Sequence, residues 1–163
     1  MTALTAEELL AWVDTTSTRW QQLLAQHPHA LQIPCDVRET TSIAGLLQHI
    51  VAVELRFAQR LAALPETSYD QIPTTSIPDI FAIHTQADRL FRQVLANPGN
   101  SWEESVEFTT RSIGTLRATR RTLLVHALMH SIRHYAQLAT LVRQHGITPG
   151  WQMDYLLMGA QRV

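Results

Sequence analysis

Three histidines recur at four-residue intervals in the C-terminal third of the sequence: His126, His130 and His134. The segment around them is otherwise rich in leucine, which predicts a helix with a buried face. Residues four apart in an α-helix lie on the same side, about 6 Å apart along the axis, so neighbouring imidazoles can reach a common ion. The spacing indicates part of a metal site. It leaves open which two histidines bind, since His126 with His130 is as good a pair as His130 with His134.

A third ligand must come from elsewhere in the chain, and His49 is the best candidate. It is the only histidine in another strongly apolar segment, which holds Leu46, Leu47, Ile50 and Val53. Three imidazoles about 2.0–2.1 Å from an ion, with water completing the coordination, form an open arrangement typical of catalytic sites. The alternative is that these are ordinary core histidines that hydrogen-bond to other polar groups.

Four long predicted helices must position these histidines. Apolar residues recur in them at three- and four-residue intervals, and serine or threonine stands where each helix begins. The predicted ranges are 5–26, 41–64, 76–97 and 119–146. The pattern predicts an all-α fold, a four-helix bundle in which sites are built from side chains that face inward.

The segments outside the four helices are predicted to be loops and one short helix. A long ordered loop joins the third and fourth helices, and residues 106–116 within it look extended, with room for a short hairpin. Residues 151–158 are expected to form a short closing helix. We expect residues 1–163 to make a single domain.

Composition limits the possible partners. The 163 residues carry a formal net charge of -1, which provides no positive excess for nucleic acid or anionic lipid. No apolar run reaches the roughly 20 residues that a membrane helix needs, and the N-terminal residues lack the pattern of a signal peptide. Cys35 is the single cysteine, so an internal disulfide is excluded. We therefore expect a cytoplasmic protein that binds neither nucleic acid nor membranes.

The segment 126–146, which opens with HALMHSIRHYAQ, resembles the last long helix of the DinB-like (YfiT-type) proteins. In that family a histidine on the second helix joins two histidines four residues apart on this helix. The resemblance implies His49, His130 and His134 as the ligands, rather than His126, and it covers most of the chain in helix order and loop position. The chain departs from the family at Tyr135-Ala136, where arginine and glycine are frequent, so no role of that arginine carries over.

The resemblance also implies an activity, one divalent metal ion and a homodimer. Characterised relatives are metal-dependent transferases and isomerases that use low-molecular-weight thiols such as mycothiol or bacillithiol. An ion that stabilises the anion of a bound thiol or water makes it a nucleophile at neutral pH, so thiol transfer and hydrolysis are both open. We expect zinc, nickel, iron or manganese. The alternative is a non-catalytic metal-binding stress-response or interaction protein whose ion is structural.

Three further polar residues are expected to lie on the surface. Glu54 is five residues after His49, about 140° around the helix, so it should point away from the ion and into solvent. His84 and Asp88 are four apart in the third predicted helix, where a surface pair is the simplest interpretation.

Residues near the second histidine of the predicted pair have more than one possible role. Arg133 and Tyr135 either line the mouth of the site or pack at the surface, and Gln137 either bridges helices or orients a bound water. Cys35 lies in a loop with no identifiable base, so we do not expect it to be a nucleophile. No glutamate is followed three residues later by histidine, which excludes the ferritin-like di-iron motif.

Overall fold

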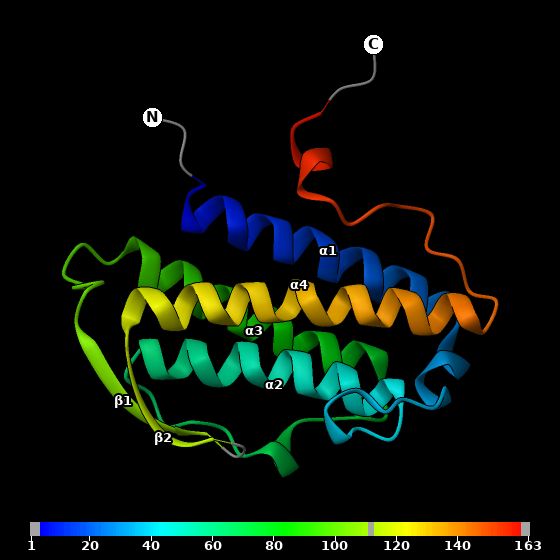
Figure 1. Ribbon diagram of the computed structural model, residues 1–163, viewed down its shortest axis with the longest axis horizontal. Coiled ribbons are helices and arrows are strands. Elements are labelled where there is room, and N and C mark those ends of the chain that lie inside the picture. Colours follow the sequence, from blue (N-terminus) through cyan, green and yellow to red (C-terminus); the bar gives the residue numbers. More distant parts are fainter. Residues whose placement is uncertain (1–3, 111–112, 161–163) are drawn as a thin grey trace.

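Four long helices make up most of the computed structural model, which describes residues 4–110 and 113–160, the Arg38 side chain excepted (Figure 1). The helices are α1 (Ala6–Gln26), α2 (Ile43–Leu61), α3 (Ile77–Ala96) and α4 (Arg120–Gln144). Their ranges agree with the predicted ones to within a few residues. Among the described residues, no helix is both long and apolar enough to cross a membrane.

Each helix begins at a hydroxyl residue that satisfies backbone N–H groups of the first turn. Thr5 and Glu8 form a reciprocal capping box at the start of α1. Ser42, Ser76 and Thr119 accept one backbone N–H each at the starts of α2, α3 and α4. The predicted helix starts are therefore confirmed, because a cap acts within three residues and can be recognised from the sequence.

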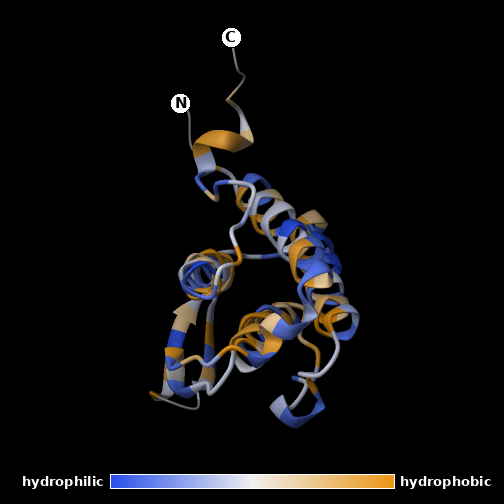
Figure 2. Cartoon of the chain, turned by 90° about the vertical axis from the view of Figure 1, so that its right-hand side faces the viewer, coloured by the Kyte–Doolittle hydropathy of each residue, from blue (hydrophilic) through white to orange (hydrophobic). Residues whose placement is uncertain are grey.

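The helices pack around one interior, with α1 and α2 each contacting both α3 and α4. Figure 2 shows them nearly end-on. All four helices contribute large buried side chains, among them Trp20, Leu46, Phe81, Phe91 and Tyr135. The packing of α2 against α4 is the contact that matters for the histidines, since His49 lies in the first of these helices and His130 and His134 in the second.

A two-stranded antiparallel sheet precedes α4, so the protein is mostly helical rather than all-α. Strands β1 (Ser105–Thr110) and β2 (Gly114–Thr119) pair in register from Ser105 with Thr119 to Thr110 with Gly114. The Phe108 ring packs edge-on against Phe57 of α2, with ring centroids 6.1 Å apart. The hairpin foreseen within residues 106–116 is therefore present and slightly longer; residues 111–112 lie outside the described part.

The predicted closing helix over residues 151–158 is wrong in extent. Only Tyr155–Met158 form a helical turn, of the 3-10 type. The Trp12 indole N–H donates to the Met153 carbonyl at 2.9 Å, and the Trp12 ring meets Tyr155 edge-on. A bond to α1 thus replaces the bond that the Met153 carbonyl would accept within a helix.

Candidate metal centre

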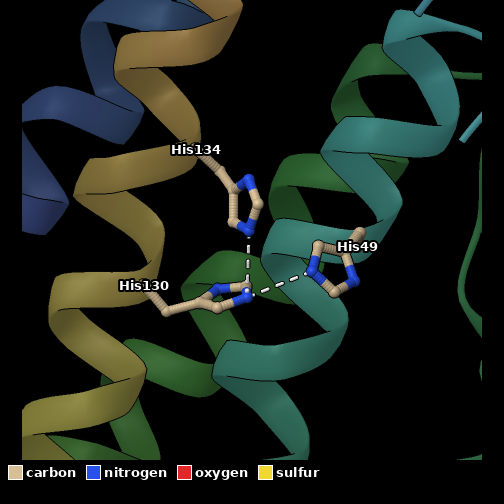
Figure 3. A group of neighbouring side chains, drawn as sticks. All are labelled: His49, His130 and His134. Carbon is tan, nitrogen blue, oxygen red and sulfur yellow. Dashed lines mark hydrogen bonds between the residues drawn. The ribbon is translucent and has the colours of Figure 1, made fainter. Parts of the chain in front are cut away.

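The side chains of His49, His130 and His134 point toward one another between α2 and α4 (Figure 3). The Nε2 atom of His130 lies 3.1 Å from the Nε2 atom of His49 and 3.1 Å from that of His134. One ring nitrogen from each histidine falls within 4.8 Å of the others. The structure therefore brings together the three residues that the resemblance singled out.

The helix packing fixes where these rings lie. Leu46 and Ile50, near His49 in α2, are fully buried in the core, and α2 packs against α4. His130 and His134 are buried, and His49 is half-buried. The cluster therefore lies largely inside the protein.

The arrangement of nitrogens is difficult to satisfy by hydrogen bonds alone. A ring nitrogen presents either one N–H or one lone pair, yet His130 Nε2 has two nitrogen neighbours at 3.1 Å. The Nδ1 atom of His134 lies 2.6 Å from the side-chain amide oxygen Oε1 of Gln137, which accepts its proton and leaves the lone pair on Nε2. His49 Nδ1 lies 3.4 Å from the Tyr69 hydroxyl, on the side away from the cluster.

The donor set is compatible with a metal ion. Ions that bind imidazole at about 2.0–2.1 Å place neighbouring nitrogens about 2.8–3.4 Å apart at octahedral to tetrahedral angles. The two separations at His130 Nε2, 3.1 Å each, fall within that range, and all three nitrogens lie within 4.8 Å of one another. The three histidines could therefore hold a metal ion.

The electrostatics keep the imidazole at the centre of the cluster neutral. Burial lowers the pKa of His130 to about 2, and the neighbouring His134, His49, Arg133 and His126 add to the effect. A neutral ring retains the lone pair that a metal needs.

A pocket of about 320 Å³ adjoins the cluster at His134. Asp36, Val37, Arg133, His134 and Gln137 line it. The Arg133 guanidinium lies 3.1 Å from His134 Nε2. Of the two roles considered for Arg133, lining the mouth of the site is the one found.

The amide oxygen of Gln137 contacts a histidine of the cluster directly, a role that was not among the two considered for it. Its spacing of three residues from His134 was the signal that could have shown this. Tyr135 is fully buried and donates its hydroxyl proton to Ser17 at 3.1 Å, away from the pocket. His126 is exposed and stacks obliquely beside His130, with ring centroids 5.6 Å apart.

The prediction that Glu54 faces solvent is wrong. Its side chain is buried at 1% exposure, and its carboxylate bonds to His84 Nδ1 at 2.8 Å. The angle from His49 showed only that Glu54 points away from the cluster. That direction leads to α3 rather than to solvent.

The predicted surface pair of His84 and Asp88 is also wrong. His84 is buried and contacts Asp14 through Nε2 at 3.3 Å as well as Glu54, while Asp88 pairs with Arg92 on the surface of α3. We call Asp14, Glu54 and His84 the ion-pair cluster. Although burial opposes the charged ring, the Glu54 carboxylate and the bond to Asp14 raise the pKa of His84 to about 10. In return, the bond from His84 lowers the pKa of Asp14.

Comparison with known families shows that the model of the DinB family matches residues 1–161. A search of curated proteins finds no match to the chain.

Proposed function

The chain belongs to the DinB family, and from that premise we propose that it binds one divalent metal ion through His49, His130 and His134. We propose further that its four helices form the bundle typical of that family, and that the protein is a metal-dependent enzyme of the thiol-transferase or hydrolase type. Zinc, nickel, iron and manganese are the candidate ions, since neutral imidazole suits several divalent metals. We extend the proposal to a cytoplasmic homodimer.

The convergence of three Nε2 atoms is the observation that carries this proposal. The His134 lone pair faces the cluster because Gln137 accepts the proton on the opposite nitrogen. No carboxylate or thiolate joins the group of ligand atoms among the described residues, so three protein ligands would leave coordination positions open.

An ion at this position would supply activation of a thiol or water, because it stabilises the anion at neutral pH. The protein's own residues set the surroundings. Gln137 orients His134, the buried side chains of α2 and α4 exclude water from the inner side, and the pocket beside Arg133 gives a small molecule access.

The second candidate function is structural. An ion shared by His49 of α2 and His130 and His134 of α4 would join two helices that are far apart in sequence, and would stabilise their packing. The pocket of about 320 Å³ next to the cluster favours the catalytic proposal, because a purely structural site needs no access for a substrate.

Elemental analysis of protein purified without a histidine tag tests the ligand set. We expect near-stoichiometric metal in the wild type and loss of it in His49→Ala, His130→Ala and His134→Ala. His145→Ala is the matched control, since His145 is an exposed histidine that bonds to a carbonyl at the end of α4.

His126→Ala decides between the two possible pairs on α4. We expect it to keep its metal, because its ring lies outside the group of converging nitrogens. A loss as large as in His130→Ala would show that the wrong pair was chosen. Full metal content in both His130→Ala and His134→Ala would overturn the site.

A further inference from the structure

The pocket beside the histidine cluster carries one positive and one negative side chain. Arg133 comes from α4, and Asp36 from the loop between α1 and α2. Both are exposed. The pocket's volume of about 320 Å³ suits a small molecule rather than a polymer.

Arg133 is placed to bind an anion. Its guanidinium contacts His134 Nε2 at 3.1 Å, and no ion pair to a carboxylate is found for it within residues 4–110 and 113–160. The lone pair of Nε2 serves either that hydrogen bond or an ion. In the metal-loaded protein the guanidinium therefore loses its partner while it still borders the pocket, and it is free to bind a carboxylate.

Asp36 is held on a loop that is fixed at both ends. The Ile43 N–H donates to the Ile33 carbonyl at 2.9 Å, and the Cys35 N–H donates to the Thr41 carbonyl at 3.2 Å. The described side chains provide no hydrogen bond or ion pair to the Asp36 carboxylate, and it does not pair with Arg133 across the pocket. An exposed carboxylate that lines a pocket from an anchored loop suits a cationic group of a ligand.

We propose that the substrate of this site is a small zwitterion of the amino-acid type, whose carboxylate binds Arg133 and whose protonated amine binds Asp36. The inference rests on the proposed metal site, because the ion releases Arg133 from His134. With the charged groups held at the two walls, the reacting group of the substrate faces the histidine cluster.

Cobalt-substituted protein provides a test that does not depend on activity, because a thiol that binds cobalt gives a new absorption band. The probes are cysteine, N-acetylcysteine, which lacks the amine charge, and cysteine methyl ester, which lacks the carboxylate. We expect cysteine to bind wild-type protein about fivefold to tenfold more tightly than either derivative. The cobalt content is measured again after titration, to exclude removal of the ion by the probe.

Variants assign each charge to its partner. Arg133→Gln should remove the preference for cysteine over the methyl ester and keep the preference over N-acetylcysteine, and Asp36→Asn should do the reverse. Arg133→Lys, which restores the charge, should recover most of the first preference. Arg143→Gln is the matched control, because Arg143 is an exposed arginine of α4 that does not line the pocket.

Two results would contradict the proposals, and they can be distinguished from each other. Protein that binds cobalt but takes up all three thiols equally would overturn the zwitterion proposal and leave the metal site intact. Protein that takes up no cobalt would overturn the metal site and this inference with it.

Discussion

The interior contains two clusters built around histidine, and they differ in the chemistry of the partners. His49, His130 and His134 face one another between α2 and α4, with no carboxylate among their ligand atoms. In the ion-pair cluster, His84 lies between the carboxylates of Asp14 and Glu54 and joins α1, α2 and α3. Both clusters are largely buried, so burial alone does not explain how they differ.

The partners give the histidines different charge states, neutral in one cluster and protonated in the other. Burial and neighbouring imidazoles lower the pKa of His130 to about 2, whereas two carboxylates overcome the effect of burial and raise the pKa of His84 to about 10. A neutral ring offers a lone pair to a metal, and a protonated ring has none. A buried histidine therefore becomes a candidate ligand or a fixed cation according to what it contacts, and the spacing of histidines along one helix does not report this.

Removing the buried carboxylate of the ion-pair cluster should have the largest effect on stability. Glu54→Leu leaves the protonated His84 with only the partly exposed Asp14, so we expect the free energy of unfolding to fall by about 3–5 kcal/mol. Urea denaturation monitored by circular dichroism measures this change in the free energy of unfolding. Asp14→Asn is the comparison and should cost less, because the Asp14 side chain is 44% exposed.

The double variant Glu54→Leu with His84→Phe separates the ion pair from packing. Replacing both charged groups with apolar ones of similar size is often neutral or stabilising. We therefore expect the double variant to recover most of the stability lost in Glu54→Leu. A double variant as unstable as the single one would mean that shape, rather than the unpaired charge, explains the loss.

A smaller effect is expected at the three-histidine cluster when the residue that orients His134 is removed. Gln137→Ala should weaken metal binding about tenfold to a hundredfold without abolishing it, because the ligand remains but its tautomer and direction are no longer fixed. Competition with a chromophoric chelator measures the affinity. Gln144→Ala, at the exposed end of the same helix, is the control, and equal affinities in the two variants would contradict an orienting role for Gln137.

Features that depend on neighbouring residues could be predicted from the sequence. The helix starts at Thr5, Ser42, Ser76 and Thr119 are examples, since a cap and its N–H donors lie within one turn. The four-residue spacing on α4 is another, although the choice of His130 and His134 over His126 came from the family resemblance.

Features that depend on packing between distant segments could not be predicted. Glu54 is 30 residues from His84, and His84 is 70 residues from Asp14, so nothing local indicates that they meet. Periodicity tells which residues share a face of a helix, and several helices can cover that face. Asp36 was missed as a pocket residue for the same reason, because a loop brings it beside α4.

The last prediction uses pH to distinguish the two clusters without altering the metal ligands. The pKa of His84 is about 10 in the folded protein, against 6.5 as its ordinary value. Below pH 6.5 both states hold the proton and the stabilisation is complete. Between pH 6.5 and 10 only the folded state holds it, so stability falls as pH rises, by up to about 1.4 kcal/mol per pH unit.

Few other charged groups near His84 complicate this measurement between pH 6.5 and 10. Asp14 and Glu54 face His84 from α1 and α2, and Arg92 lies 3.7 Å from Asp14; the sequence contains no lysine. Urea denaturation at pH 7, 8 and 9 should therefore show a decline in the wild type that the double variant at positions 54 and 84 lacks. Equal slopes would mean that His84 is not held as a cation, and the contrast between the two clusters would then rest on their geometry alone.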